Sequence, residues 1–437
     1  MLKNTFCSSP WFHIRLSYDG GYKKCRWQRG FAPENNINEV GLLDSLNTDE
    51  MSKFRQQMLN GEKPKGCDTC YYQDELHKLS ARHKQLLKSG IRVDDFENSL
   101  LSSPHISDFT YSNDNNGATQ NVPTDLHLDI GNLCNSGCIM CEPYASSKLV
   151  QDYIKLYKKS DLFYNPPPQT SWVENKTVFD KFLKDLSSID GLRYIQLLGG
   201  ETLYNKAFYD ICESLIESGK SQTCILGTTT NGTIYKPELE NIIPKFKEFH
   251  LGISIESVTP LNDYIRYPGK IDSILANIDS FLSLRQTNPG LHITLRITPN
   301  IFTVYDLDQL FEYAIEKKIT LEACFIMFKP ECLRMELMPD DIRQEVIDKL
   351  QHLIDRHGLS RHNITNIRNQ ESISEVTSDS VHEYLNFVKN YNKPADTEYQ
   401  RQKLVEFLKS FESLRNNTIL DYAPRYKEFL TSIGYKP

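Results

Sequence analysis

Short apolar runs alternate with longer amphipathic stretches through the middle of the chain. Six runs have the length and alternation of strands, at residues 126–130, 194–198, 223–229, 249–255, 292–297 and 321–328. Helical patterns lie between them, for example at 208–218 and 272–284. Strands that alternate with helices indicate parallel βαβ units. The pattern therefore predicts an α/β fold, with a partial (β/α)6 TIM-like barrel over residues 124–335.

The flanks of this region have different patterns. Residues 11–18 and 22–27 are expected to be two strands of a hairpin, because Asp19-Gly20-Gly21 between them favours a tight turn. Helices are expected at 48–60 and 71–89, which gives a small cysteine-rich α+β domain over residues 1–90. Residues 91–123 are rich in Ser, Asp and Asn and are expected to be a linker. Residues 336–437 contain repeated helical patterns and predict a helical C-terminal region over the barrel mouth.

Composition narrows the class of protein. Hydrophobic residues at 39% and charged residues at 24% are typical of a globular enzyme. The net charge of −7 makes a nucleic-acid partner unlikely. The sequence contains no apolar run of membrane-spanning length and no apolar core of a signal peptide near residue 1, so we expect a cytoplasmic protein without membrane contact. Cysteines in the cytoplasm stay reduced, which favours metal or cluster ligation over disulfides.

Three of the eleven cysteines follow the first barrel strand in one short loop. Cys134, Cys138 and Cys141 have the spacing C-x3-C-x2-C, and three thiolates at such spacing suit three irons of a [4Fe–4S] cubane, leaving the fourth iron open. A zinc site is the alternative, but structural zinc prefers four closed ligands, and this loop offers three. The spacing therefore favours an iron–sulfur cluster with an open iron.

Four further cysteines lie in the first 70 residues: Cys7, Cys25, Cys67 and Cys70. The last two form a C-x2-C pair, and four thiolates make a closed site for either zinc or a second cubane. The spacing does not choose between these metals. The remaining cysteines, Cys212, Cys224, Cys324 and Cys332, have no metal-like spacing and are expected to be buried apolar residues.

Polar residues and glycines gather where the predicted strands end, the edge at which such barrels place their chemistry. Each group has a plain structural alternative: a strand-to-helix turn, an Asn-Gly turn or a surface ion pair. Together they are the candidate ligand-binding residues Gly199, Gly200, Glu201, Thr230, Asn231, Ser254, Glu256, Arg266 and Arg296.

The chain resembles the radical SAM superfamily, and within it the members that have an auxiliary cluster domain of the twitch or SPASM type, here at the N-terminus. The stretches that support the resemblance are CSSPWFHIRLSYDGGYKKC, GEKPKGCDTC, CNSGCIMC, LGGETL, TTNGT, SIES, YIRYPG and LRNNTILDYAPRYKEF. They extend over nearly the whole chain.

The resemblance implies cofactors and roles. Cys134, Cys138 and Cys141 would bind the [4Fe–4S] cluster that holds S-adenosylmethionine (SAM). Gly200 and Glu201 would hold the methionyl amino group, and Ser254, Glu256 and Arg266 would lie near the ribose and the carboxylate. The implied reaction is reductive cleavage of SAM to a 5′-deoxyadenosyl radical that abstracts hydrogen from a substrate.

The resemblance also implies partners. A second [4Fe–4S] cluster would occupy the four N-terminal cysteines, and a flavodoxin or ferredoxin would act as reductant. A peptide is the expected substrate, with a small metabolite, sugar or nucleotide as the alternative. A non-catalytic zinc- or cluster-binding scaffold is the alternative from another class.

Overall fold

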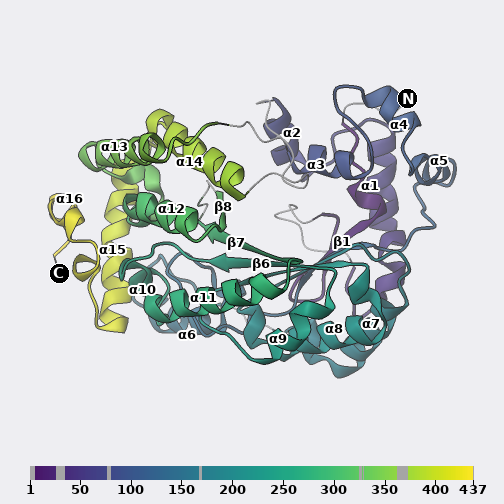
Figure 1. Ribbon diagram of the computed structural model, residues 1–437, viewed down its shortest axis with the longest axis horizontal. Coiled ribbons are helices and arrows are strands. Elements are labelled where there is room, and N and C mark those ends of the chain that lie inside the picture. Colours follow the sequence, from purple (N-terminus) through teal and green to yellow (C-terminus); the bar gives the residue numbers. More distant parts are fainter. Residues whose placement is uncertain are drawn as a thin grey trace.

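The fold is organised around one eight-stranded sheet with the strand order β2-β1-β3-β4-β5-β6-β7-β8 (Figure 1). The computed structural model describes residues 5–25, 35–75, 80–166, 170–323, 327, 329–361 and 373–436. All neighbouring strands are parallel except β2, which is antiparallel to β1. The strands are β1 (His13–Leu16), β2 (Tyr22–Lys23), β3 (Asp125–Asp129), β4 (Tyr194–Leu198), β5 (Ile225–Thr230), β6 (Glu248–Ser254), β7 (Leu291–Ile297) and β8 (Thr320–Ala323). The predicted α/β class and partial barrel are confirmed.

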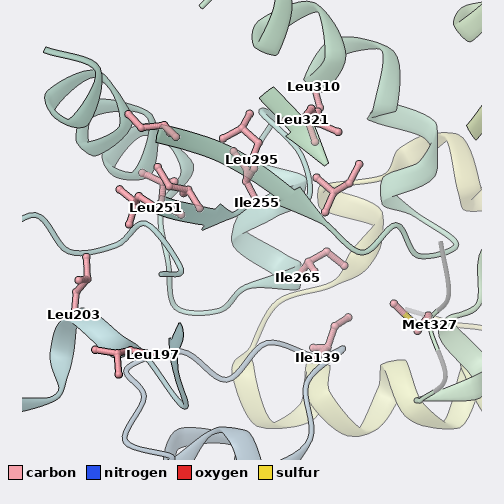
Figure 2. Close-up of a cluster of buried hydrophobic side chains, with 14 of the residues drawn as sticks. Ile139, Leu197, Leu203, Leu251, Ile255, Ile265, Leu295, Leu310, Leu321 and Met327 are labelled. Carbon is pink, nitrogen blue, oxygen red and sulfur yellow. The ribbon is translucent and has the colours of Figure 1, made fainter. Parts of the chain in front are cut away.

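Helices follow the barrel strands and cover one face of the sheet. They are α6 (Ser147–Leu156), α7 (Lys176–Ser188), α8 (Lys206–Glu217), α9 (Glu238–Ile242), α10 (Leu261–Ile265), α11 (Ile271–Thr287) and α12 (Leu307–Glu316). Asn175 and Asn205 cap α7 and α8, since their side chains accept backbone hydrogen bonds from Val178 and Ala207. Figure 2 shows part of the apolar core that these elements share.

The two faces of the barrel strands differ sharply in polarity. In β7 the apolar residues Leu291, Ile293, Leu295 and Ile297 are buried in the core, while His292, Thr294 and Arg296 at the alternate positions line a cavity inside the barrel. Successive side chains of a strand point to opposite faces, so this alternation separates an apolar outer face from a polar lumen. The lumen is therefore suited to hold a polar ligand.

The N-terminal segment contributes to the barrel itself. The strand expected at 11–18 forms as β1, and it pairs in parallel with β3. The expected return strand is shorter, β2, and its predicted end at residues 26 and 27 lies outside the described residues. Beyond it come α1 (Asp49–Leu59), α2 (Asp68–Glu75) and α3 (Ala81–Lys88).

Residues 91–123 were expected to be a linker, and this prediction is wrong because the segment contains two helices. It folds into α4 (Phe96–Leu101) and α5 (Ile106–Asp114). Phe96, Leu100 and Phe109 pack into a second apolar cluster with residues of the first 91 positions, among them Phe6 and Trp11. The prediction failed because Ser, Asp and Asn dominate the composition of the segment, although three of its apolar side chains are buried. These three side chains pack against the N-terminal residues.

The C-terminal region is helical, as predicted, with α13 (Asp340–His357), α14 (Ile373–Asn390), α15 (Thr397–Arg415) and α16 (Lys427–Ser432). Helix α14 lies along the edge strand β8, where Thr377 Oγ1 accepts from Leu321 N at 3.2 Å and Ser380 Oγ donates to Leu321 O at 3.0 Å (Figure 1). These contacts satisfy polar backbone groups that an open sheet edge would expose. Among the helices described, none combines the length and the apolarity needed to cross a membrane.

Candidate functional site

The loop with Cys134, Cys138 and Cys141 follows β3 at the carboxyl end of the barrel. Its backbone is fixed to the end of α10 and the residues that follow, because Gly137 N donates to Tyr267 O at 2.7 Å and Ile139 N donates to Ile265 O at 3.0 Å. Figure 2 shows Ile139, which belongs to the loop, and Ile265 within a cluster of buried hydrophobic side chains. The loop is therefore a fixed part of the structure, and its cysteines face a defined environment.

The sulfur atoms of this loop accept hydrogen bonds. Ser136 N donates to Cys134 Sγ at 3.4 Å, and Arg266 Nη1 donates to Cys138 Sγ at 3.7 Å. Burial raises the pKa of the Cys134 thiol to about 11 and that of Cys141 to about 12. Buried thiolates need a bound cation and donors at sulfur to be stable. The donor set fits a metal centre, and its three thiolates fit a cubane with one open iron.

Gly199 and Gly200, at the end of β4, support the loop from the neighbouring strand. Both have positive φ angles, 110° and 53°. A Cβ atom added at Gly199 would lie 2.2 Å from Gly131 O, and one at Gly200 would lie 2.2 Å from Leu133 O. Both candidate ligand-binding glycines therefore let the end of β4 approach the backbone of the cysteine loop and the residues just before it.

We expect Gly200→Ala to destabilise the protein by more than about 3 kcal/mol, because both φ strain and a backbone clash oppose the side chain. Gly219→Ala is the matched control, since Gly219 also has a positive φ of 73° but no atom within 4 Å of an added Cβ. The control should cost only about 1 kcal/mol. Urea unfolding of the two variants measures the difference, and equal losses would contradict the role of the close approach.

Glu201 is fully buried and joins β4 to β5. Its Oε1 accepts from Thr230 Oγ1 at 2.7 Å and from Leu203 N at 3.0 Å, and its Oε2 accepts from Asn231 N at 2.5 Å. The Glu201 backbone N–H donates to Leu133 O at 2.9 Å. Burial raises the pKa of Glu201 and these donors oppose that shift. Asn231 Nδ2 in turn donates to Asn135 Oδ1 and Ser136 Oγ, so one network fixes three predicted site residues to the cysteine loop.

Glu256 and Arg266 form a buried ion pair beside Cys138. Arg266 Nη2 donates to Glu256 Oε1 at 2.7 Å, and Thr298 N donates to Glu256 Oε2 at 2.8 Å. Burial raises the pKa of Glu256 to about 7, against the opposing effect of Arg266. Arg266 therefore links this carboxylate to a cysteine sulfur. The structure brings these two candidate site residues together, and their hydrogen bonds to each other and to Thr298 use part of their bonding capacity within the protein.

Ser254 and Arg296 lie farther from the cysteine loop, opposite each other on β6 and β7. Arg296 Nη1 donates to Thr229 Oγ1 at 2.9 Å, and its side chain passes over Gly252, where a Cβ would meet Nε at 2.7 Å. Arg296 lines the lumen cavity. In the predicted strand 321–328, Met327 is buried, whereas Cys324, Phe325, Ile326 and Phe328 lie outside the described residues.

The four N-terminal cysteines come together at the amino ends of the strands. Cys7 precedes β1, Cys25 follows β2, and Cys67 and Cys70 lie at the start of α2; all four line one cavity of about 490 Å³. Cys67 interacts electrostatically with the other three. Burial raises the pKa of the Cys7 and Cys70 thiols, and the backbone at Ser9 and Arg82 opposes this shift. The same cavity is lined by lumen residues of the barrel, so the two cysteine sites lie at opposite ends of the strands.

Arg415 was not among the predicted site residues, yet it fixes the cysteine loop from the C-terminal region. Its Nη2 donates to Gly137 O at 2.5 Å and to Asp152 Oδ2 at 2.8 Å, and its guanidinium lies over the rings of Tyr267 and Phe411. Both members of the ion pair are buried. No local signal predicts this contact, because 278 residues separate Arg415 from Gly137.

We expect Arg415→Ala to cost about 3–5 kcal/mol of unfolding free energy, because it leaves the buried Asp152 carboxylate without its cation. Arg356→Ala is the control, since Arg356 pairs with Glu312 at the surface with 60% of its side chain exposed. An exposed pair contributes less than about 1 kcal/mol. Losses of similar size in denaturant unfolding of both variants would contradict this role of Arg415.

Comparisons with known proteins agree with this geometry. Residues 128–298 match the family profile described as Radical SAM superfamily, a region that runs from β3 through β7. No protein with a curated description matches the chain.

Solved structures similar to the chain include Streptococcus suis SuiB bound to S-adenosylmethionine, at 14% identity over 80% of this chain and 71% of that chain, with a TM-score of 0.35. Native anSMEcpe with bound AdoMet is similar at 15% identity over 54% of this chain and 60% of that chain, with a TM-score of 0.36. SuiB bound to the precursor peptide SuiA has 14% identity over 81% and 70%, with a TM-score of 0.35. The profile match includes the three-cysteine loop and the strand ends that fix it, and residues 128–298 therefore form a region of the radical SAM superfamily, whose cofactors are a [4Fe–4S] cluster and S-adenosylmethionine.

Proposed function

We propose that Cys134, Cys138 and Cys141 hold the SAM-binding cluster and that the substrate lies in the polar lumen beneath it. The observation that supports this most directly is the placement of the three-thiol loop at the carboxyl edge of a barrel whose cavity is lined by polar side chains such as His127, His292 and Arg296. When bound, the cluster and SAM supply reductive cleavage of a carbon–sulfur bond and a 5′-deoxyadenosyl radical that abstracts hydrogen from the substrate.

The protein's own residues fix and tune this site. Arg266 donates to Cys138 Sγ, and hydrogen bonds to a ligand sulfur are one of the means by which proteins adjust cluster potentials. Gly200, Glu201, Ser254 and Glu256 are proposed to contact SAM. Glu201 retains acceptor capacity on Oε2, since a carboxylate oxygen accepts two hydrogen bonds and Asn231 N supplies one. The ammonium group of the methionyl end is a suitable donor for that position.

We expect Glu201→Gln to weaken SAM binding by about 10-fold, or 1–2 kcal/mol, because a charge-assisted hydrogen bond becomes a neutral one. The variant should also melt earlier, since the new amide NH2 must face one of three protein donors. Glu217→Gln, at an exposed position on α8, is the control and should change neither property. A lower melting temperature with unchanged SAM affinity in a titration would leave Glu201 a structural role only.

We further propose that Cys7, Cys25, Cys67 and Cys70 bind a second, fully ligated [4Fe–4S] cluster. A tetrahedral zinc site with Zn–S bonds of 2.3 Å places its sulfur atoms about 3.8 Å apart. Within the described chain, no three of these sulfurs lie within 4.8 Å of one another. A cubane spaces its ligands more widely, because each binds a different iron. The sulfur spacing supports a cluster.

Metal analysis of the anaerobically reconstituted protein tests both proposals. Two cubanes give about eight irons and eight sulfides per chain. About four irons with one zinc would reject the second cluster and assign the four N-terminal cysteines to zinc. A protein with zinc alone would support the non-catalytic scaffold.

The substrate is proposed to present a polar group to the lumen. Its cavity is lined by His13, His127, His250, His292, Asp125 and Arg296. A cavity of about 490 Å³ is within the range of small-molecule sites. A polar peptide side chain and a small polar metabolite both fit this description, and the peptide, together with a flavodoxin or ferredoxin reductant, remains the prediction drawn from the resemblance.

A further inference from the structure

We propose that Glu248, His250 and His292 bind one divalent transition-metal ion at the amino end of the lumen, with ligands of its own in the cavity that the four N-terminal cysteines also line. Glu248 and His250 lie two residues apart on β6, so they face the same side of the sheet. His292 of β7 is the direct register partner of His250. The parallel pairing of the two strands therefore places two imidazoles and one carboxylate together without any contribution from a loop.

The geometry of the three side chains suits a single ion. One ligand atom from each residue lies within 4.8 Å of those of the other two. His250 Nε2 and Glu248 Oε2 are 3.1 Å apart, and the two histidine rings have centroids 4.9 Å apart at an interplanar angle of 69°. Ligands of a metal with bonds of about 2.0–2.2 Å lie about 3–4 Å from one another, so small side-chain rotations complete the site.

The donor set indicates the class of ion. Two imidazoles and one carboxylate bind Zn²⁺, Fe²⁺ and related ions and leave coordination positions open. His250 and His292 both line the lumen cavity, together with Thr294 and Thr320, which are register partners on β7 and β8. An open position would therefore face the cavity. A carboxylate, carbonyl or phosphate oxygen of a molecule in the lumen is the class of ligand that such a position takes.

A second histidine–carboxylate pair in the chain provides a comparison, because no third ligand residue lies beside it in the described part of the chain. His357 Nε2 lies 2.9 Å from Glu312 Oε1, which is a histidine–carboxylate pair like that of His250 and Glu248. Among the described residues, no third histidine, cysteine or carboxylate completes that pair to a ligand group of the same size. The difference between the two pairs is His292, so His357 provides a matched control.

Zinc binding by the anaerobically reconstituted holoenzyme, free of any affinity tag, tests the proposal. Competition with a chromophoric chelator should show one zinc site beyond the metal already in the cysteine sites. His250→Ala and His292→Ala should each weaken this site by about 100-fold or more, since loss of even an outer-shell partner costs 10–100-fold. Glu248→Gln, which keeps the side-chain volume, should weaken it as well, and His357→Ala should leave it unchanged. Melting temperatures confirm that the variants are folded.

Location of the ion completes the test. Anomalous scattering measured above and below the zinc edge, on crystals exposed to Zn²⁺, should give a peak between β6 and β7 that is distinct from the iron positions. Zinc found only at cysteines, no additional zinc site, or equal affinity in wild type and all three ligand variants would each overturn the proposal.

Discussion

Cys67→Ala combined with Cys70→Ala is expected to halve the iron content of the protein, from about eight to about four per chain, while SAM cleavage persists. The two residues supply half of the proposed ligands of one cluster, at the end of the lumen opposite the three-cysteine loop. Two thiolates do not retain a cubane that needs four. The other cluster keeps all three of its ligands and its open iron, so 5′-deoxyadenosine should still form.

A matched variant separates loss of ligands from loss of cysteine as such. Cys212 and Cys224 are buried outside both cysteine sites, and Cys212→Ala with Cys224→Ala should keep about eight irons. Iron and sulfide assays on both double variants, reconstituted side by side, provide the comparison. If the Cys67, Cys70 variant kept all its iron, these cysteines would not be cluster ligands; if it lost zinc instead, the site would be a zinc site.

The barrel could be predicted from the sequence because its strands and helices have local sequence patterns. Alternation of apolar and polar residues placed the strands close to their observed bounds, as for the run 194–198, which forms β4. The pairing of β1 with β3 was not predictable in this way, because the choice of a parallel partner depends on contacts more than 100 residues apart along the chain. The helices α4 and α5 were missed because Ser, Asp and Asn outnumber the few apolar residues that pack.

Only part of the candidate site could be predicted from the sequence. Cysteine spacing and the Gly199-Gly200-Glu201 motif predicted a ligand site, yet the structure shows that the motif also builds the support of the cysteine loop. The contact of Arg415 with that loop has no local signature. The same holds for His250 and His292, which become neighbours only through strand register. Local sequence patterns thus indicated which residues could bind a cofactor, whereas the contacts that hold those residues in place join parts of the chain that are far apart in sequence.

Replacement of Cys134, Cys138 and Cys141 by Ala is expected to abolish 5′-deoxyadenosine formation completely. No other residue can supply the three thiolates of this loop, and without them the cluster and the open iron that receives SAM are lost. The N-terminal cysteines remain, so this variant should retain about four irons, but a fully ligated cluster offers no position for SAM. The predicted defect is therefore loss of SAM cleavage with only partial loss of iron, the converse of the Cys67, Cys70 variant.

The most direct measurement is 5′-deoxyadenosine released from SAM under dithionite, quantified for the wild type and the Cys134, Cys138, Cys141 variant after identical anaerobic reconstitution. The account predicts that the wild type forms 5′-deoxyadenosine and that the variant forms none above the protein-free background. Equal amounts from the two proteins, or none from a wild type that contains its full complement of iron and sulfide, would contradict it.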